Sequence, residues 1–295
     1  MPANCANTTN LETMSFDPNA AAALLWQHWQ AGTALAALPE RLRPNTRAEG
    51  HAIQALLPRA ADRAVLGWKI AATSAGGQAH IGVSGPLAGR ILAGELQFSG
   101  PTLAGEWQLA PGDDADLPTI ALHGNRMGVA EPEFAFRMGA DLPPRSRPYS
   151  VQEVLAAVAT LHPAFEAPNS RFADFAHAGE AQLQADNACS GRFVIGAPAP
   201  VNWRALDLRQ LQVQGRVIDA TGVRLDRSGD GSAVLGDPRI ALAWLSNELS
   251  GLGLTLRAGD VVSTGTCMVP LPVKPGDKVE ADFGVMGRLS ARFVD

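Results

Sequence analysis

The sequence predicts an α+β protein in which a mixed β-sheet is folded on itself and a small helical subdomain lies at the N-terminus. Three observations lead to this expectation. Helical patterns occupy the first part of the chain, β patterns dominate from Val65 onward, and the C-terminal part alternates short β runs with Gly-Asp turns. Strands and helices do not alternate regularly, so the pattern does not fit a Rossmann fold or a βα-barrel.

The N-terminal region is expected to contain a tail and the helical subdomain. Residues 1–15 are polar and without pattern, as in a disordered tail. Residues 16–64 are assigned to the helical subdomain, because Asp17-Pro18 has the residue types of an N-cap and a first helical position. A second helix is expected after Asn45. Residues 65–295 then form the larger domain.

Strands, loops and two further helices are expected in this larger domain. Val65–Ala71 and Val129–Met138 read as strands, whereas Pro and Gly mark loops at 111–118 and 143–148.

The first of these helices should begin with a capping box at Ser150 and continue through Leu155, Val158 and Leu161. The second begins at Asp237-Pro238 and ends at Gly251.

Composition and charge exclude several classes of protein. The chain has 295 residues, 46% of them hydrophobic, which is enough for one substantial core. A net charge of −5 without a long basic run argues against nucleic acid or a membrane surface as a partner. The three cysteines are widely spaced and suit neither a disulfide framework nor a zinc site. We therefore expect a protein of the reducing cytoplasm.

Three glutamates in apolar surroundings are the most informative residues. Glu131 and Glu133 flank Pro132, and Glu166 lies in a second apolar segment. Residues i and i+2 of an extended segment point to the same face, and a cation removes the cost of burying unpaired carboxylates. Three oxygen ligands without His or Cys favour Mg²⁺ or Mn²⁺ over zinc. The alternative is a Glu-x-Glu pair on a solvated strand.

Other polar residues also stand out as candidates, each with a plainer alternative. Lys69 lies in an apolar run, where it must be paired or have a lowered pKa unless it reaches solvent from an edge strand. Arg171 could clamp a carboxylate or simply be solvated. Thr264-Gly265 follows a strand and could cradle an anion or end the strand, and Asp186-Asn187 could cap a turn.

Short motifs in a fixed order resemble the fumarylacetoacetate hydrolase superfamily, within it the branch of 2-keto-4-pentenoate hydratase and 4-oxalocrotonate decarboxylase. The resemblance runs from about Ala20 to the C-terminus. The motifs are Gly67-Trp68-Lys69-Ile70, Glu131-Pro132-Glu133, Glu166, Ala185-Asp186-Asn187-Ala188, Gly236-Asp237-Pro238, Ala258-Gly259-Asp260 through Gly265, and Pro275-Gly276-Asp277.

This resemblance implies a mixed β-sheet roll and a set of site residues. Glu131, Glu133 and Glu166 would hold Mg²⁺ or Mn²⁺. Lys69 and Asp186 would be catalytic, and Asn187, Thr264 and Gly265 would contact substrate. Arg171 is added to the expected substrate contacts on its side-chain chemistry alone. The implied enzyme is a lyase for 2-oxo acids or 2-hydroxydienoates from the catabolism of aromatic-ring cleavage products, and a homo-oligomer.

One departure from the family pattern bears on the reaction. The hydratases carry an Asp as acid/base where Gly82-Val83-Ser84-Gly85-Pro86-Leu87 places Leu87 in this chain. Leucine cannot move a proton, which favours a decarboxylase or tautomerase, whereas the overall resemblance favours a hydratase. If hydration were observed, Glu106 or Asp186 could supply the missing group.

Two further alternatives remain open. An acylpyruvate C–C hydrolase would need a His–Glu pair, but Glu49 and His51 are at i and i+2 of an expected helix and diverge. Leu87 permits a catalytically inactive assembly partner, but an intact set of three metal-binding glutamates argues against it.

Overall fold

The structure is a computed structural model that describes residues 16–99 and 117–295. The expected tail at residues 1–15, most of the expected loop at 111–118, and Glu106 lie outside the described residues.

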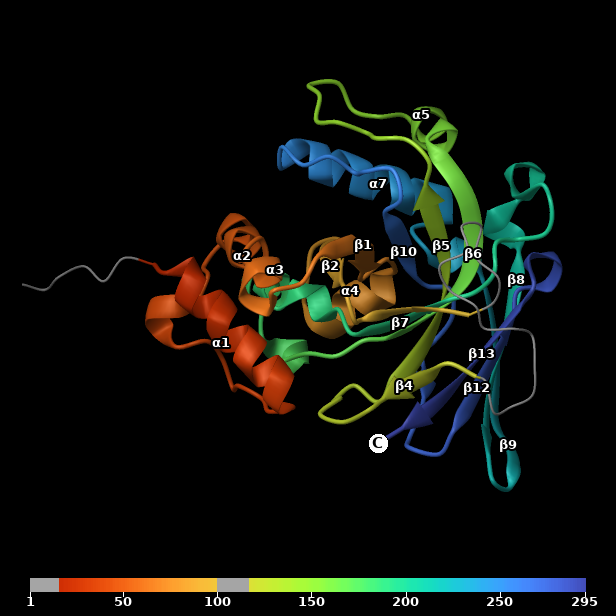
Figure 1. Ribbon diagram of the computed structural model, residues 1–295, viewed down its shortest axis with the longest axis horizontal. Coiled ribbons are helices and arrows are strands. Elements are labelled where there is room, and N and C mark those ends of the chain that lie inside the picture. The colour runs from red at the N-terminus through yellow and green to blue at the C-terminus, as the bar shows by residue number, and fades with distance from the viewer. Residues whose placement is uncertain (1–15, 100–116) are drawn as a thin grey trace, which may run out of the picture.

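Three α-helices form the N-terminal region: α1 (Pro18–Ala31), α2 (Arg47–Gln54) and α3 (Leu57–Ala61), with a 3₁₀ turn η1 (Glu40–Leu42). Asp17 caps α1 by accepting from two backbone N–H groups, as predicted. A capping box at Thr46 begins α2, one residue after Asn45. These helices lie together at one end of the molecule (Figure 1).

The core of this helical region also uses residues from later in the chain. Leu25, Leu38 and Ile53 pack together with Phe172 and Ala185, and all five are buried. The helices therefore bury their apolar faces partly against the larger domain. The division between residues 64 and 65 stays a prediction.

The larger of two sheets has eight strands in the order β2-β1-β10-β5-β6-β7-β3, with β11 paired to β5. It is mixed, because β1 pairs with β10 and β3 with β7 in parallel, and the other pairs are antiparallel. The strands are β1 (Val65–Ala71), β2 (Leu87–Leu92), β3 (Leu96–Phe98), β5 (Val129–Met138), β6 (Val158–Ala167), β7 (Arg192–Ile195), β10 (Val261–Thr266) and β11 (Leu271–Pro272).

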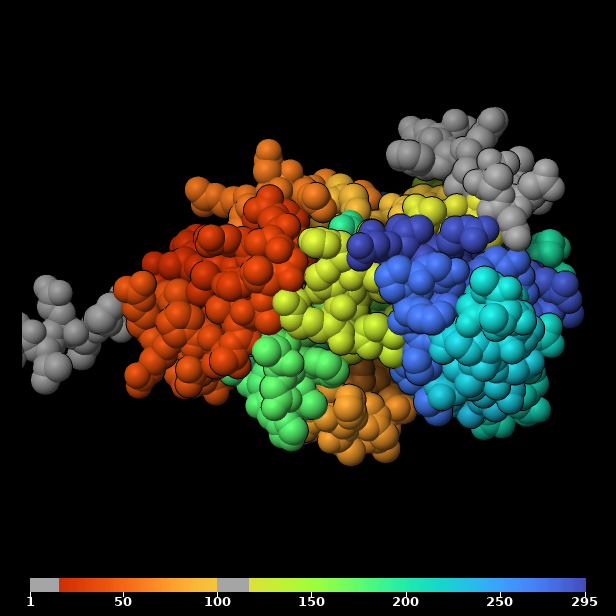
Figure 2. Space-filling model, turned by 90° about the horizontal axis from the view of Figure 1, so that it is seen from below, coloured from red at the N-terminus to blue at the C-terminus, as the bar shows by residue number. Residues whose placement is uncertain are grey.

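The second sheet has five strands in the order β4-β13-β12-β8-β9. They are β4 (Thr119–Ala121), β8 (Gln212–Asp219), β9 (Gly222–Asp230), β12 (Lys278–Asp282) and β13 (Arg288–Val294). Phe134 of the first sheet meets Phe283 edge-on, with 5.6 Å between ring centroids. Figure 2 shows the residues of β8 and β9, in cyan, at the opposite end from the N-terminal helices. The predicted mixed, curled sheet is confirmed.

The remaining α-helices are α4 (Ala75–Ile81), α5 (Val151–Ala156), α6 (Glu180–Ala185) and α7 (Pro238–Gly251). Short 3₁₀ turns are η3 (Phe175–His177), η4 (Asn187–Cys189), η5 (Trp203–Ala205), η6 (Leu208–Gln210), η7 (Gly231–Ala233) and η8 (Gly284–Met286). Helix α7 begins and ends as predicted.

The capping box at Ser150 is confirmed, but the helix that it begins is shorter than predicted. The expected continuation through Val158 and Leu161 was wrong, because these residues belong to β6. This strand lies between β5 and β7 and is largely buried, so its apolar residues show no period-2 alternation.

Candidate active site

The three glutamates converge on one spot because β5 and β6 are neighbouring antiparallel strands. Glu131 lies directly opposite Glu166, and Glu133 lies two residues further along β5 on the same face. One carboxylate oxygen from each lies within 4.8 Å of the other two. Glu133 and Glu166 are completely buried, and Glu131 is half-buried.

Hydrogen bonds within the described residues satisfy this cluster only in part. Glu133 Oε2 accepts from the Ser263 hydroxyl and from the Gly265 N–H at 2.9 Å. Glu133 Oε1 and Glu166 Oε1 have no donor among the described residues. Buried carboxylate oxygens without a partner are costly, and metal ligation is one of the few ways to satisfy them.

The electrostatics of the cluster also fit a divalent cation. Burial raises the pKa of Glu133 and Glu166, and burial together with the nearby Glu133 raises the pKa of Glu131 to about 7. When all three carboxylates are ionised, Lys69 balances one of them and two negative charges are left over. A divalent ion would neutralise them, and the all-oxygen donor set fits Mg²⁺ or Mn²⁺.

Lys69, on β1, is the lysine of this cluster. Its Nζ lies 3.2 Å from Glu166 Oε2 and donates to the Ala188 carbonyl at 3.0 Å. Burial alone would lower the pKa of Lys69, but Glu166, Glu131 and Glu133 together raise it above its ordinary value. The lysine is therefore held as a cation inside the sheet, and it does not reach solvent from an edge strand.

A cavity of about 670 Å³ opens beside the cluster. Lys69, Glu131 and Gly265 line it, and its walls continue over α4, η3, the end of β9 and the loop after β10. Gly265 has a φ of +94°, and a Cβ there would meet the Thr73 side chain, so glycine suits this position.

Thr264 does not present its hydroxyl to the cavity. The hydroxyl donates to the Phe134 carbonyl at 2.9 Å, and the residue is fully buried. Strand alternation turns the residue away from the cavity, and the expected substrate contact of Thr264 stays a prediction. The same alternation brings Ser263 and Gly265 onto the face of Glu133. The role of Ser263 was missed, although its place in the strand could have revealed it.

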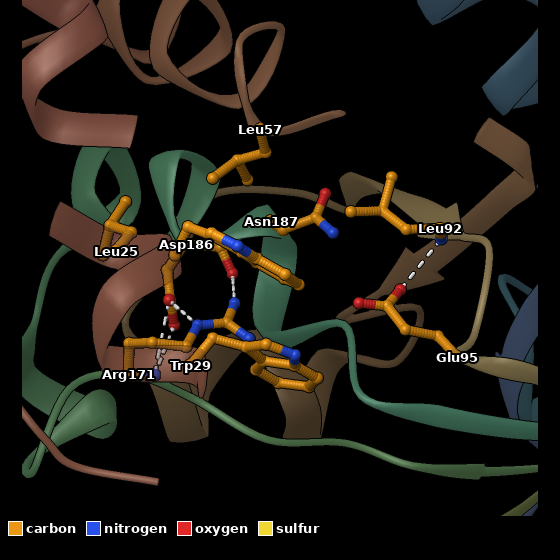
Figure 3. A pocket seen from close by; sticks show the side chains of 9 residues that line it. Leu25, Trp29, Leu57, Leu92, Glu95, Arg171, Asp186 and Asn187 are labelled. Carbon is orange, nitrogen blue, oxygen red and sulfur yellow. Dashed lines mark hydrogen bonds and ion pairs between the residues drawn. The ribbon is translucent and has the colours of Figure 1, made fainter. Parts of the chain in front are cut away.

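Asp186 and Arg171 are bonded to each other and line a second, smaller pocket together with Asn187 and Trp29 (Figure 3). Neither of the two lines the larger cavity beside the glutamates. The Arg171 backbone N–H and the Ser170 hydroxyl donate to Asp186 Oδ2 at 3.1 and 2.6 Å, and the Arg171 guanidinium pairs with the same carboxylate. The guanidinium lies 4.8 Å from the Trp29 ring. Both residues are buried and satisfy each other, and their expected roles in catalysis and substrate binding stay predictions.

Asn187 likewise makes structural contacts. Its side chain accepts from the Arg90 N–H at 2.7 Å and donates to the Arg90 carbonyl at 2.8 Å, which fixes η4 against β2. These two bonds are to backbone groups of Arg90, and the expected substrate contact of Asn187 stays a prediction. The 185–189 segment serves the site through the Ala188 carbonyl that orients Lys69.

Leu87 is completely buried in an apolar cluster with Ile81, Val83 and Leu183. It does not line the cavity, so neither the residue type nor its surroundings offer a proton here.

Glu49 and His51, the pair considered for a hydrolase, have different interaction partners. Glu49 completes the capping box of α2, and His51 Nε2 lies 3.3 Å from Glu248 Oε1 of α7. The structure therefore does not pair Glu49 with His51.

Comparisons with known proteins agree with this fold. The family model for the C-terminal region of fumarylacetoacetate hydrolase matches residues 107–294. The chain is 32% identical over 276 residues to a 2-keto-4-pentenoate hydratase of Paraburkholderia xenovorans (strain LB400), covering 92% of this chain and 93% of the relative. It is 34% identical over 173 residues to a 2-hydroxyhexa-2,4-dienoate hydratase of Comamonas testosteroni, covering 56% and 60%.

A solved structure shares the fold. The 4-oxalocrotonate decarboxylase from Pseudomonas putida G7, complexed with magnesium and adipate, superimposes with a TM-score of 0.78 at 24% identity, covering 94% of this chain and 97% of that one. The chain belongs to the fumarylacetoacetate hydrolase family. Within the described ranges, no helix is both long and apolar enough to cross a membrane.

Proposed function

We propose that the protein is a divalent-metal-dependent lyase that acts on a 2-oxo acid or its 2-hydroxydienoate enol. The observation that carries this proposal is the buried cluster of Glu131, Glu133 and Glu166 with unpaired oxygens beside Lys69. The relatives named as hydratases of 2-keto-4-pentenoate and 2-hydroxyhexa-2,4-dienoate support this class of substrate. Such substrates arise in the catabolism of aromatic-ring cleavage products.

Glu131, Glu133 and Glu166 would hold Mg²⁺ or Mn²⁺. When bound, the ion supplies Lewis acidity toward the C1 carboxylate and C2 oxygen of the substrate, which favours the enolate. Ser263 and the Gly265 N–H keep the Glu133 carboxylate in place.

Lys69 would act from the wall of the same cavity. Its ammonium balances negative charge at the cluster and can move a proton to or from the substrate. The Ala188 carbonyl aims Nζ at this position.

Hydration is the reaction that we favour, because the chain matches relatives named as hydratases over nearly its whole length. Decarboxylation or tautomerisation is the second candidate, and Leu87 is the observation that favours it. Neither of these two reactions requires a general base to activate water, so the loss of an acid/base group would affect them less.

The test is to incubate the purified full-length protein with 2-hydroxypenta-2,4-dienoate and Mg²⁺. Loss of the dienoate ultraviolet absorbance together with a product heavier by one water identifies a hydratase. Absorbance loss without a mass change identifies a tautomerase, and loss of CO₂ from a β-keto acid analogue identifies a decarboxylase. Glu133→Gln should abolish the activity, whereas Glu40→Gln, an exposed glutamate of η1, should not. Absence of all three reactions with the metal present would contradict the proposal.

We also propose that the enzyme is a cytoplasmic homo-oligomer, on the basis of its family resemblance and its cysteine content. Light scattering of the purified protein measures the oligomeric state directly, and a mass close to 30.9 kDa would contradict this.

A further inference from the structure

We propose that the cavity selects acids with a single carboxylate and an apolar tail longer than that of a five-carbon dienoate. This inference rests on the proposed function, because it places the carboxylate and C2 oxygen of the acid at the glutamate cluster. It goes further by naming the chemical class of the rest of the substrate.

The direction of the substrate follows from burial along β5. Glu133, Glu131 and Val129 alternate onto one face of the strand. Glu133 is completely buried, and Glu131, Val129 and Met127 are half-buried. The cluster therefore lies at the deep end, and Val129 and Met127 line the cavity further out. An acid bound head-first must extend its tail along these two residues.

The outer walls are apolar and leave room for such a tail. Phe175 and Met127 pack against the buried cluster that contains Ile81, and Met268 and Val269 contribute from the loop after β10. Val269 is 67% exposed, as expected for a residue at the mouth of the cavity.

The size of the cavity points to a longer tail as well. Its volume is about 670 Å³. A five-carbon dienoate has about eight non-hydrogen atoms, and even at the ~30 Å³ that a liquid water occupies it would fill at most about 240 Å³. Such an acid would leave most of the apolar wall in contact with water.

The charges around the cavity disfavour a second carboxylate. Among the described residues that line it, Lys69 is the single permanent cation, and Lys69 is held at the deep end by Glu166 and Ala188. The wall also contains Asp230, whose pKa is lowered by hydrogen bonds from Ser232 and which is therefore anionic. A tail carboxylate would lose water and face an anion with no partner cation.

His80 also lies on the outer wall of the cavity. Its ring packs edge-on against Phe175, with 5.9 Å between centroids, and it adds to the aromatic surface there.

The test measures binding by calorimetry, with the full-length protein saturated with Mg²⁺. The probes are pyruvate, 2-oxopentanoate, 2-oxohexanoate, 2-oxooctanoate and 2-oxohexanedioate. We expect Kd to fall by up to about fourfold for each added methylene, the value for complete burial of that group. We expect 2-oxohexanedioate to bind at least about tenfold more weakly than 2-oxohexanoate, which has the same chain length.

A charge placed on the outer wall should reverse this preference. Met127→Lys should raise the affinity for 2-oxohexanedioate relative to 2-oxohexanoate by about tenfold or more. Met127→Leu should keep the wild-type ratio, and so should Val223→Lys, which puts the same charge on an exposed valine of β9 outside the cavity.

Two results would overturn the inference while leaving the proposed function intact. The first is an affinity that does not change with tail length. The second is tighter binding of 2-oxohexanedioate than of 2-oxohexanoate. Either result counts when the protein also binds pyruvate and turns over the dienoate. If no 2-oxo acid binds in the presence of Mg²⁺, the inference and the proposed function fail together.

Discussion

Replacing Glu131 by glutamine should affect the metal-free and metal-loaded proteins in opposite directions. Burial and Glu133 raise the pKa of Glu131 from 4.5 to about 7. Each unit of pKa shift corresponds to about 1.4 kcal/mol, so ionising Glu131 lowers the free energy of unfolding of the metal-free protein by up to about 3 kcal/mol. Because the residue is half-buried and borders the cavity, we expect solvent to reduce this cost to about 1–3 kcal/mol.

The sign of the pH dependence follows from the raised pKa. The folded protein holds the Glu131 proton at a pH where the unfolded chain has lost it. The metal-free protein should therefore lose stability as pH rises from about 4.5 to about 7 and remain at the lower value above that. Glu131→Gln removes this loss, and the variant without metal should melt about 2–6 °C higher than wild type at pH 8. With Mg²⁺ the order should reverse, since the variant lacks one ligand.

Thermal unfolding followed by circular dichroism at pH 5 and pH 8, in EDTA or in Mg²⁺, measures both effects. Glu40→Gln is the matched control on the surface. Burial also raises the pKa of Glu95 to about 7, which adds to the pH dependence of stability. Wild type, variant and control share this contribution, so it cancels when their melting temperatures are compared. The reasoning is refuted if Glu131→Gln lowers the melting temperature in EDTA at pH 8, or if Mg²⁺ stabilises this variant as much as wild type.

Three further substitutions test individual residues. Lys69→Ala should lower turnover by about 10²–10⁴-fold, because Lys69 moves protons. The Mg²⁺ affinity measured in a metal titration should stay nearly unchanged, because Lys69 is not a ligand. Turnover equal to that of wild type would make Lys69 a structural residue. Leu87→Asp and Leu87→Asn should each cost at least about 2 kcal/mol in urea unfolding and leave the ratio of hydration to tautomerisation unchanged, because Leu87 is buried in an apolar cluster and does not line the cavity. A ratio that rises with Leu87→Asp alone would show that a carboxylate at position 87 reaches the substrate. Asp186→Ala should lower the free energy of unfolding in urea by about 3–5 kcal/mol, because it leaves the Arg171 guanidinium buried without its partner. The kcat of the folded variant should stay close to that of wild type. Lost turnover at undiminished stability would make Asp186 catalytic.

The parts of the fold that have local signals could be predicted from the sequence. Asp17-Pro18, the Ser150 capping box and Asp237-Pro238 mark helix starts through chemistry within one turn. Val158–Ala167 could not be assigned in the same way. It is buried by its neighbours β5 and β7, and a continuous apolar run does not reveal whether it is helix or strand.

The candidate site, like the fold, could be predicted only where the signal is local in the sequence. Strand alternation alone predicted that Glu131 and Glu133 share a face, but only the register of β5 against β6 shows that Glu166 lies opposite Glu131. The expected role of Asp186 came from its position in a motif, and that of Arg171 from the chemistry of its guanidinium. Neither signal reveals that the two side chains satisfy each other.

The central claim is that three glutamates bind one divalent cation, and a crystal structure grown with Mn²⁺ tests it most directly. Anomalous scattering locates the ion without reference to the surrounding chain. We predict one strong peak about 2.0–2.3 Å from carboxylate oxygens of Glu131, Glu133 and Glu166, with its remaining positions open to water or substrate. Carboxylates that remain within 4.8 Å of one another while the ion binds elsewhere, or does not bind at all, would contradict the claim.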